Sequence, residues 1–554
     1  MPVVTLYLNR LKGLLKARAS DAEIKAAIPY LGLDLEEEGD GFLRVEYNPN
    51  RPDYSTDAGV ARGLNGFLGY ETGTPRYNVM MGNTRVVIDP SILSLRAHIV
   101  CLKARGLEFD EESIRQLISM QEDLHNGLGR RRQKVSIGLH NFDVLDPPFR
   151  YGAVPPSFRF PPLGQTVPMT IAEILGKTEA GRTYGHLVKE FTSYPVLADW
   201  NGRVLSFPPI INGERTRVSS ATKNLFVDVT GTDLRACGNT LSIVAAFLHD
   251  VGGKIETVTM EYPHTTYSTP NLSPYEVPVD EELVRRVLGL ELPDGEIARC
   301  LARCRITAAK RGGQLIATIP RYRLDQLHAV DIVEEVAIGY GLQNFTPTYP
   351  VSASVGAPHR GLASLRTVET VLAGLGLIQS VGFSLIAEED VVKASEGRLR
   401  PMIRVESSKS REHEILRSSL LPSLLAVLAR NIHEEYPQRI FEVAKVFQPD
   451  FGGPGKVSEE YHAGTLVAHV GASFTEAKSL LAALLRQAFN RECTTPMKTD
   501  PTFAVGRSAG IRVGRLSLGF VGEVRPEVLR NFQLRTPVAG FEVNLSPLLA
   551  ARRG

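Results

Sequence analysis

Four carboxylates that lie close together in the sequence are the strongest candidates for chemistry: Asp325, Asp331, Glu334 and Glu335. They belong to the stretch TIPRYRLDQLHAVDIVEEVAIGYG, residues 318–341, in which no lysine or arginine follows Arg323. At about 100° per residue, the last three carboxylates share one arc of a helix and the apolar side chains fill the opposite arc. Carboxylates three or four positions apart repel each other by about a few tenths of a kcal/mol per pair, and no cation on this helix offsets that.

The charge of this helix has two interpretations. The acidic arc can be an ordinary solvated surface, or it can be matched by a partner. That partner would be a hard cation, which prefers oxygen ligands, or a basic surface on another chain. Asp325 stands at the helix entrance and not on the acidic arc, so it reaches the other three only if the preceding loop folds back.

A second candidate is the segment SFPPIINGERTRV, residues 206–218, in which two prolines precede two isoleucines and Asn212. The prolines fix the backbone and remove two backbone donors, so we expect a rigid extended segment. Such a segment can present its remaining backbone groups to a small ligand. The alternative is an edge strand followed by a turn.

Two further segments carry polar groups at element boundaries. VTGTD, residues 229–233, places hydroxyls and Asp233 where a strand leads into a helix, so Asp233 either caps the helix or binds a polar group of a substrate. LGRRRQK, residues 128–134, is the densest basic run. It is either a solvated loop before a strand or a contact with RNA phosphates.

Bulk composition limits the function classes. A chain of 554 residues is too long for one core, so we expect three to five domains. The net charge of +2 does not by itself indicate a nucleic-acid-binding protein. Cys300 and Cys304 are an i,i+4 helix pair without a second pair nearby, which argues against zinc. The sequence contains no Walker loop, HExxH or GxSxG motif, so no self-sufficient active site is evident.

The first residues, MPVVTLYLNRLKGLL, lack the apolar core and cleavage site of a secretion signal. No apolar run approaches 18 residues, so we expect no contact with a membrane. These features, together with cysteines that we expect to be ordinary buried thiols, predict a cytoplasmic protein.

The pattern of strands and helices predicts an α+β multidomain protein with four domains. Residues 1–85 and 86–272 both mix strands and helices, and residues 195–207 in the second domain are predicted to form a hairpin that turns at Asn201-Gly202. Residues 273–346 are mostly helical around one short strand, in a layout similar to a winged helix. Residues 347–554 have the pattern of an α+β domain with an antiparallel sheet.

Seven segments, in this order, resemble the β subunit of phenylalanyl-tRNA synthetase in its short archaeal and eukaryotic form. They are NPNRPD at 48–53, LGRRRQKVSIGLH at 128–140, YPVLADWNGRVLSFPPIINGERTRV at 194–218, LFVDVTGTD at 225–233, PRYRLDQLHAVDIVEEVAIGYG at 320–341, LRSSLLPSLL at 416–425 and FEVAKVF at 441–447. Each match is modest alone, but seven in the order of the family are specific.

The resemblance implies an α2β2 heterotetramer in which the α subunit performs ATP-dependent charging of tRNA(Phe) with phenylalanine. The β subunit is expected to support the assembly and to hydrolyse tRNA(Phe) wrongly charged with tyrosine. Residues 86–272 would be the editing domain, and residues 347–554 a class II synthetase-like domain without catalytic motifs. The alternative is a stand-alone RNA-binding or editing protein that is built from the same domains.

The resemblance also implies sites. Asp325, Asp331, Glu334 and Glu335 match the positions that hold Mg²⁺ together with the α subunit. The editing pocket is expected between the segment from Leu205 to Asn212 and the strand end from Thr230 to Asp233, with Asp233 as the polar contact. The sequence departs from the family pattern at TEAGRTYGHL, residues 178–187, and at Asn126, where an aromatic residue is usual.

Overall fold

The computed structural model describes residues 2–352, 354–395, 401–450, 452 and 457–551. The chain divides into two compact units, residues 1–348 and 349–554. Each unit has its own hydrophobic cores, and we describe the two separately. The boundary between them lies two residues after the predicted start of the last domain.

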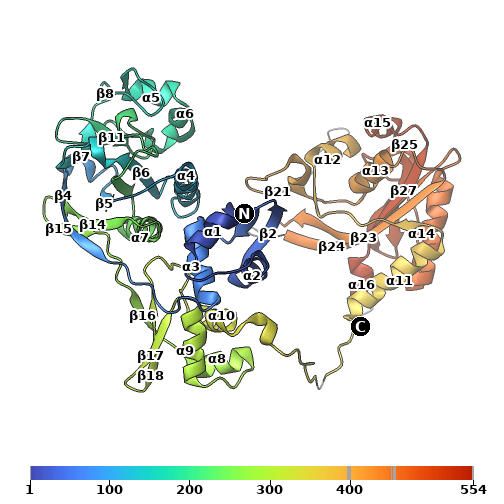
Figure 1. Cartoon of the computed structure of the whole chain (residues 1–554). Coiled ribbons are helices and arrows are strands. Elements are labelled where there is room, and N and C mark those ends of the chain that lie inside the picture. The colour runs from blue at the N-terminus through green and yellow to red at the C-terminus, as the bar shows by residue number, and fades with distance from the viewer. Residues whose placement is uncertain (1, 353, 396–400, 451, 453–456, 552–554) are drawn as a thin grey trace. The chain divides into compact units, whose positions relative to one another are not determined.

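The chain begins with a three-stranded antiparallel sheet in the order β1–β3–β2, formed by Val3–Tyr7, Phe42–Tyr47 and Leu33–Gly39. Helices α1 (Leu8–Leu14), α2 (Asp21–Ala27) and α3 (Asp57–Phe67) accompany it (Figure 1). Ser20 begins α2 with a capping box: its Oγ accepts a hydrogen bond from the Glu23 amide, and the Glu23 carboxylate accepts one from the Ser20 amide. Val60, Ala61, Leu64 and Phe67 of α3 pack into this core, as the helical pattern predicted.

A ten-stranded mixed sheet forms the largest part of the first unit. Its strands run in the order β12–β11–β10–β7–β4–β14–β5–β13–β6, and β15 pairs with β14. Their bounds are Ile211–Asn212, Val204–Phe207, Tyr194–Ala198, Phe149–Val154, Val79–Ile88, Lys254–Glu261, His98–Arg105, Leu225–Gly231, Val135–Asn141 and, for β15, Thr266–Thr269. Only the pairs β4–β14 and β4–β7 are parallel. The β10–β11 hairpin confirms the predicted turn, where Gly202 adopts a φ of +76°.

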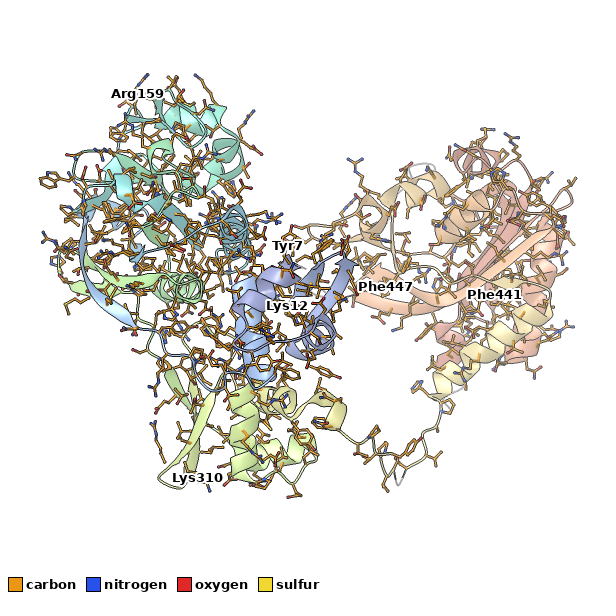
Figure 2. All side chains as sticks on the ribbon, in the orientation of Figure 1. Tyr7, Lys12, Arg159, Lys310, Phe441 and Phe447 are labelled. Atoms are coloured by element: carbon orange, nitrogen blue, oxygen red, sulfur yellow. The ribbon has the colours of Figure 1, made fainter. Side chains whose placement is uncertain are left out.

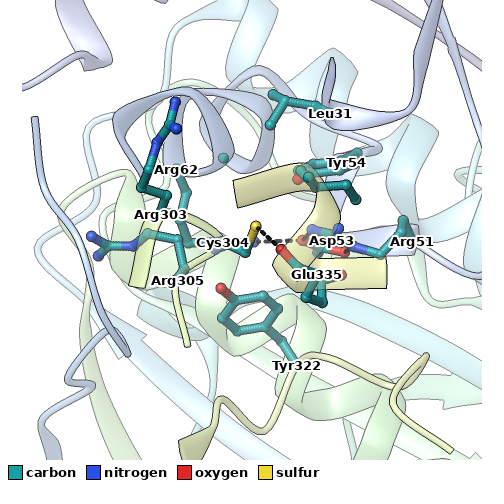
Figure 3. A pocket seen from close by; sticks show the side chains of 12 residues that line it. Leu31, Arg51, Asp53, Tyr54, Arg62, Arg303, Cys304, Arg305, Tyr322 and Glu335 are labelled. Carbon is teal, nitrogen blue, oxygen red and sulfur yellow. Dashed lines mark hydrogen bonds and ion pairs between the residues drawn. The ribbon is translucent and has the colours of Figure 1, made fainter. Parts of the chain in front are cut away.

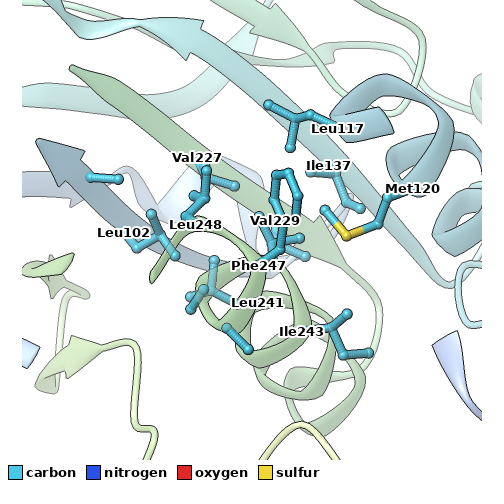
Figure 4. Close-up of a cluster of buried hydrophobic side chains, with 14 of the residues drawn as sticks. Leu102, Leu117, Met120, Ile137, Val227, Val229, Leu241, Ile243, Phe247 and Leu248 are labelled. Atoms are coloured by element: carbon cyan, nitrogen blue, oxygen red, sulfur yellow. The ribbon is translucent and has the colours of Figure 1, made fainter. Parts of the chain in front are cut away.

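Two long helices share one core with this sheet. Helix α4 (Glu111–Asn126) contributes Leu117 and Met120, and α7 (Leu234–Asp250) contributes Leu241 and Phe247. They meet the side chains of β5, β6 and β13 in a cluster of buried aliphatic residues (Figure 4). All seven residues of β13 are buried, which is the setting of a central strand.

The remainder of the first unit combines helices α8 (Glu281–Leu288), α9 (Asp294–Arg303) and α10 (Ala329–Tyr340) with a three-stranded sheet. The sheet has the order β16–β18–β17, formed by Tyr275–Pro278, Gln314–Ile319 and Thr307–Arg311. The sequence predicted only the middle strand, because the outer strands are short and mostly polar. Apolar residues of all three helices fill the small core.

The second unit is built on a six-stranded sheet in the order β19–β23–β24–β27–β26–β25. Its strands are Ile378–Gln379, Gln438–Pro449, Val457–Ala468, Val538–Asn544, Leu516–Val524 and Phe503–Val513. Every pair is antiparallel except β19–β23, which is parallel. The chain between β19 and β23 forms a small sheet of β20 (Leu385–Ile386), β22 (Ile415–Leu416) and β21 (Ile403–Arg404).

Successive side chains of these strands point to opposite faces of the sheet, so they contribute to two separate cores in the second unit. Phe441 of β23 and Phe541 of β27 pack with α11 (Arg360–Gly374) and α14 (Phe474–Phe489). Ile440 of the same β23 packs in a separate core with α12 (Glu388–Ser395), α13 (Leu421–Arg430) and α15 (Pro526–Asn531). Phe441 is buried near the start of β23, and Phe447 is half-buried further along the strand (Figure 2). The last described helix is α16 (Ser546–Ala551).

One predicted domain boundary needs correction. The junction placed at residues 85/86 falls inside β4, a strand of the ten-stranded sheet, so this sheet begins at Val79. The junction at 272/273 falls between β15 and β16, which belong to different sheets. Within the described residues, no helix is both long and apolar enough to cross a membrane.

Candidate functional site

A cavity of about 560 Å³ opens in the ten-stranded-sheet region, and we call it the central cavity. Its walls come from α4, from β6, from the turn after β11 and from residues 163–164. Ile114, Leu117 and Ile118 make one side aliphatic, and Pro208 and Pro209 stand across from them in the lining. A volume between about 300 and 1,000 Å³ with mostly apolar walls is typical of small-molecule sites.

Asp228 brings a carboxylate to this cavity from the buried strand β13. His140 Nε2 lies 2.7 Å from Oδ2 of Asp228, and Nδ1 of the same ring lies 2.9 Å from the Thr216 hydroxyl. Gly138 pairs with Asp228 across the sheet, and a Cβ there would lie 2.0 Å from Oδ2. The glycine therefore provides the space in which a buried carboxylate and an imidazole stand side by side.

Arg132 forms a second polar feature of the central cavity. Its guanidinium donates to Glu122 at 2.7 Å and to the Ile210 carbonyl at 3.0 Å, and it lies 4.2 Å from the centre of the Tyr184 ring. Its Nε is buried and has no hydrogen-bond partner among the described residues. An unpaired buried donor costs about 1–3 kcal/mol, so this N–H is a natural contact for a bound oxygen atom.

The arginine reaches the cavity through an unusual backbone. Arg130, Arg131 and Arg132 have φ values of +48°, +54° and +65°, in the left-handed region that residues with a Cβ seldom occupy. Arg130 and Arg131 are exposed, whereas Arg132 is half-buried. The basic run is thus neither wholly a solvated loop nor wholly a basic surface, because one of its arginines is part of the cavity wall.

His125 lies beside Glu122 in the same wall. Its Nε2 accepts a hydrogen bond of 2.8 Å from the Ile137 amide, and its Nδ1 lies 3.2 Å from Glu122. Burial lowers the pKa of His125 and outweighs the opposite influence of Glu122. The ring is therefore neutral near pH 7 and acts as a hydrogen-bond acceptor toward the strand.

Of the two walls expected for an editing pocket, residues 206–212 of the first, Asn212 included, line the central cavity, whereas Leu205 and the strand end from Thr230 to Asp233 do not. Leu205 is fully buried in a core on β11, and Thr230 is buried where its Oγ1 accepts from Arg96 Nε at 3.0 Å. Asp233 caps α7: its Oδ1 accepts from the Ala236 amide at 3.0 Å, and its Oδ2 lies 3.0 Å from Lys134 Nζ. The central cavity therefore includes one of the two predicted walls and lacks the other.

The proline segment also differs from the prediction. Residues 208–210 form a tight turn that joins β11 to β12, and Ile210 donates its amide to the Phe207 carbonyl at 2.8 Å. The prediction of an extended segment was wrong, because the backbone reverses at the two prolines. The alternative of an edge strand and turn is confirmed, and the turn itself forms part of the cavity wall.

The acidic helix α10 has a cation that the sequence pattern did not reveal. Arg323, which precedes the helix, is fully buried and donates to Asp325 from Nε at 2.8 Å and to Glu335 from Nη1 at 3.2 Å. Burial alone would lower the pKa of Arg323, but Glu335 and Asp325 raise it well above the ordinary value. Burial would raise the pKa of Asp325, and Arg323 lowers it well below its usual range.

The helical wheel was wrong for two residues. Glu335 is only 4 % exposed because it pairs with Arg323, whereas Val330, assigned to the apolar arc, is 53 % exposed at the helix start. Asp331 half-caps the helix, since its Oδ2 accepts from the amides of Leu327 and His328 at 2.6 Å each. Glu334 remains exposed, as predicted.

Glu334 lies near the negative charges of three other carboxylates. Partial burial raises the pKa of Glu334, and the charges of Glu335, Asp325 and Asp331 raise it further. Across the residues that the structure describes, no three His, Cys, Asp or Glu side chains form a metal-binding group. The four carboxylates together therefore do not make a preformed cage for a cation. Glu334 is exposed and Asp331 half-buried, and neither forms an ion pair with an arginine among the described residues.

The Arg323 cluster joins two motifs that are far apart in the sequence. Asp53 of NPNRPD accepts from Arg51 at 2.9 Å, and both Arg51 and Arg323 help to lower the pKa of Asp53, against its burial. Cys304 lines the same pocket as Asp53 and Glu335, and its thiol donates to the Glu335 carbonyl at 3.2 Å (Figure 3). Burial raises the pKa of Cys304 well above the ordinary value, so this thiol is unreactive.

The sequence predictions did not single out Asp228, His140 or Arg323, and they included Arg132 only as one member of the basic run LGRRRQK. Two of them carried a local signal: Asp228 interrupts a strand that is otherwise apolar, and a buried charge needs a partner. Arg323 stands two residues before Asp325 but outside α10, so a helical wheel of that helix does not include it. For Arg132 and His140, no local pattern distinguishes them from surface residues.

Two protein-family models and several full-length relatives match this chain. The family model described as tRNA synthetase B5 domain matches residues 277–342, and that described as Phenylalanyl tRNA synthetase beta chain CLM domain matches residues 346–545. The phenylalanine–tRNA ligase β subunit of Archaeoglobus fulgidus is 38% identical over 99% of this chain and 98% of its own length. That of Pyrococcus horikoshii is 36% identical over 99% of this chain and 100% of its own.

A solved structure supports the same relationship. The crystal structure of an N-terminal fragment of the phenylalanyl-tRNA synthetase β subunit from Pyrococcus horikoshii aligns with a TM-score of 0.59 and 38% identity. It covers 61% of this chain and 100% of the fragment.

Both family models describe domains of tRNA synthetases, so this chain is a component of an enzyme of that class. The full-length relatives make it more specific: the chain belongs to the family of phenylalanine–tRNA ligase β subunits. A β subunit implies an α subunit as its partner. The match runs over nearly the whole chain, which is expected of a subunit and not of a stand-alone protein that shares only some domains.

Proposed function

We propose that the central cavity is the site at which this β subunit hydrolyses tRNA(Phe) wrongly charged with tyrosine. The observation that carries the proposal is Asp228, a buried carboxylate that faces a cavity with largely aliphatic walls. An apolar synthetic pocket rejects an added hydroxyl only by about a hundredfold, so a second site must recognise that hydroxyl. Asp228 offers an acceptor for the phenol, and phenylalanine would leave it unpaired at a cost of about 1–3 kcal/mol.

The rest of the cavity would hold the esterified end of the RNA. Arg132 Nε is a buried donor without a partner, so it would bind an ester or ribose oxygen. Asn212, whose amide nitrogen lies 3.4 Å from the Leu139 carbonyl, stands at the rim of the same cavity. We assign no general base among these side chains, and we propose that the RNA 3′ end itself positions the attacking water.

The test of the editing proposal is hydrolysis of preformed Tyr-tRNA(Phe) by the assembled enzyme carrying Asp228→Asn. A hydrogen bond to a charged group contributes about 1.5–3 kcal/mol, so we expect hydrolysis to slow about tenfold to a hundredfold. Phenylalanylation serves as the internal control because it uses the α subunit. Asp146→Asn, an exposed carboxylate in the same region, is the matched variant and should hydrolyse normally. Wild-type hydrolysis by Asp228→Asn would refute the site.

We also propose that the chain works as part of an α2β2 heterotetramer in the cytoplasm, and that residues 273–346 have a winged-helix-like layout. Residues 349–554 would be a class II synthetase-like domain that contributes to assembly and not to catalysis. What supports the last point is the sequence: after residue 347, the Arg-x-Glu motif for ATP and the arginine after a Gly-rich strand are missing from their expected places. ATP-dependent charging would then belong to the α subunit.

For Mg²⁺, we propose a site at Glu334 and Asp331 that ligands from the α subunit complete. Asp325 and Glu335, which Arg323 engages, would contribute negative potential and not direct ligands. Mg²⁺ keeps several waters and needs only one or two protein carboxylates, which suits an exposed Glu334. The ion would neutralise charge that otherwise accumulates at this helix.

The magnesium proposal predicts a specific pattern of stability. Because the folded-state pKa of Glu334 is raised, its ionisation disfavours folding as the pH rises above about 4.3, the ordinary glutamate value. Without Mg²⁺ at pH 7, Glu334→Gln should therefore be at least as stable as the wild type. Added Mg²⁺ should raise the melting temperature and strengthen α–β assembly for the wild type only.

Glu282→Gln, an exposed glutamate on α8, is the matched control and should respond to Mg²⁺ like the wild type. Melting curves and sedimentation of the copurified subunits at several Mg²⁺ concentrations provide the measurements. An identical Mg²⁺ response of Glu334→Gln and the wild type would count against this site.

A further inference from the structure

A second cavity of the first unit, of about 180 Å³, has a marked excess of positive charge, and we call it the basic cavity. It lies among α1, α3, the segment at residues 71–77, the end of α7 and the residues after α9. Four permanent cations line it, Lys16, Arg62, Arg76 and Arg305, against two carboxylates, Glu71 and Asp250. It is separate from the central cavity and from the acidic face of α10.

Two of the cations are built into the wall. Arg62 is 8 % exposed; it pairs with Asp250, and its Nη2 lies 3.6 Å from Asp53. Arg305 is 4 % exposed, and its Nη2 lies 3.3 Å from the Glu71 carboxylate. These pairs use both carboxylates of the lining, so the charges of Lys16 and Arg76 have no counterpart there.

Arg305 supplies the observation that points to a ligand. Its Nε is buried and has no hydrogen-bond partner among the described residues, although its Nη groups bind Glu71. Its backbone adopts a φ of +64°, in the left-handed region that is costly for a residue with a Cβ. Gly66 leaves room for the side chain, since a Cβ there would lie 2.8 Å from Cδ of Arg305. The left-handed backbone and the unpaired Nε of Arg305 each cost free energy. A bound hydrogen-bond acceptor would remove the second of these costs.

Lys16 and Arg76 complete the arrangement from the outside. Both side chains are exposed. Among the described residues, neither forms an ion pair with a carboxylate of the lining. The backbone near Lys16 is fixed, because Asn65 accepts from the Lys16 amide at 2.8 Å and donates to the Leu14 carbonyl at 3.3 Å. One buried guanidinium and two exposed cations in the same lining suit a compact anion with several acceptor oxygens.

We propose that the basic cavity binds a phosphate group. A tetrahedral oxyanion can accept from Arg305 Nε while Lys16 and Arg76 balance its charge. A cavity of about 150 Å³ holds a molecule the size of benzene, so about 180 Å³ admits a phosphate and part of one ester substituent. Tyr77, which lines the cavity and stacks edge-on against His249 with ring centres 4.9 Å apart, would lie beside that substituent.

The test is calorimetric titration of the full chain, alone and copurified with its α subunit, with inorganic phosphate in a phosphate-free buffer. Sodium chloride at matched ionic strength corrects for screening. We expect one phosphate per chain, with binding about tenfold weaker in Lys16→Ala/Arg76→Ala, since one charge-assisted hydrogen bond accounts for roughly that factor. Both substitutions are at exposed positions, so folding should persist, and circular dichroism checks this.

Arg182→Ala/Lys189→Ala removes two exposed cations elsewhere in the same unit and should bind phosphate like the wild type. Two further titrations identify the source of the group. Tighter binding of a nucleoside monophosphate would assign the cavity to a small phosphate ester, whereas displacement of phosphate by tRNA would assign it to the RNA backbone. No heat beyond the chloride control, equal binding by both double variants, or loss of binding once the α subunit is present would overturn the proposal.

Discussion

Two buried carboxylate–histidine pairs, one in each unit, show how the same residue types serve different ends. In the first unit, His140 Nε2 lies 2.7 Å from Asp228 Oδ2. In the second, His462 Nδ1 lies 2.6 Å from Glu542 Oε1. Each pair lies next to a cavity, of about 560 Å³ and about 360 Å³ respectively. From composition alone, both pairs would be candidates for chemistry.

Their difference lies in how completely the carboxylate is satisfied. Glu542 Oε2 accepts from the Ser419 hydroxyl at 2.5 Å and from the amides of Leu420 and Leu421 at 3.0 and 3.3 Å. These groups begin α13, so Glu542 anchors a helix start, where a negative charge is favourable. Asp228 receives its donors at Oδ2, from His140 and from Ser206 at 3.5 Å, and the described residues bring none to Oδ1. A carboxylate with one oxygen free of protein donors can accept a hydrogen bond from a ligand. A carboxylate whose oxygens already accept from the protein stabilises the fold.

The largest expected effect tests this contrast directly. Glu542→Ala removes one partner of an ion pair and takes the carboxylate acceptor from Ser419, Leu420 and Leu421, of which Leu421 keeps Ser419 Oγ as an acceptor. It should destabilise residues 349–554 by about 3–5 kcal/mol. Asp228→Ala takes a hydrogen-bond partner from the buried His140 and should cost about 1–3 kcal/mol in the first unit. Denaturant unfolding, followed separately for each unit, measures both losses.

Glu459→Ala is the control for the second unit, because its pair with Lys445 lies at the surface and contributes about 0–1 kcal/mol. Equal losses for Glu542→Ala and Asp228→Ala would erase the distinction between an anchoring and a ligand-binding carboxylate.

The sequence predicted much of the fold because helices and strands leave local periodic patterns. The patterns predicted the helix α10, the β10–β11 hairpin and the junction of β13 with α7 at Asp233. The outer strands of the small sheet were missed, because β17 carries mostly exposed residues and shows no alternation of buried side chains. Strand order is set by pairings between distant segments, so no local pattern could supply it.

The candidate site was predicted less well, for a related reason. The family motifs identified the correct segments, yet the side chain that faces the cavity within LFVDVTGTD is Asp228 and not Asp233. That choice depends on which face of β13 meets β6 and the turn after β11. Likewise, Arg323 pairs with Glu335 from the loop that precedes α10. A helical wheel covers only the helix and gives no position for a residue of that loop.

Asp233 offers a smaller, sharper test of the same assignment. It caps α7 through the Ala236 amide and lies outside the lining of the central cavity. Asp233→Ala should therefore cost about 1 kcal/mol of stability and leave hydrolysis of Tyr-tRNA(Phe) intact. Asp233→Asn, which keeps the capping oxygen, should recover most of that stability. Lost hydrolysis in Asp233→Asn would return the editing site to the strand end.

The smallest effect concerns pH, and here the two units should respond in opposite directions. Burial would lower the pKa of His462, but hydrogen bonding to Glu542 raises it above the ordinary value near 6.5. The stabilisation from His462 is thus fully present below about pH 6.5 and is lost as the pH rises through the raised folded-state value. His125 in the first unit has a lowered pKa, so the unfolded chain takes up a proton first. Stability there should decline as the pH falls below about 6.5.

Melting each unit between pH 5 and 9 would reveal the two slopes, and a single substitution assigns each. His462→Gln should flatten the decline of the second unit at high pH, and His125→Gln that of the first unit at low pH. The comparison matters for function because the Glu542 pair holds its charges for the fold, whereas the wall of the central cavity keeps a neutral histidine beside Glu122 and Arg132. If both units lost stability in the same direction and neither substitution changed a slope, His125 and His462 would not differ in protonation, and the expected opposite pH responses of the two units would be refuted.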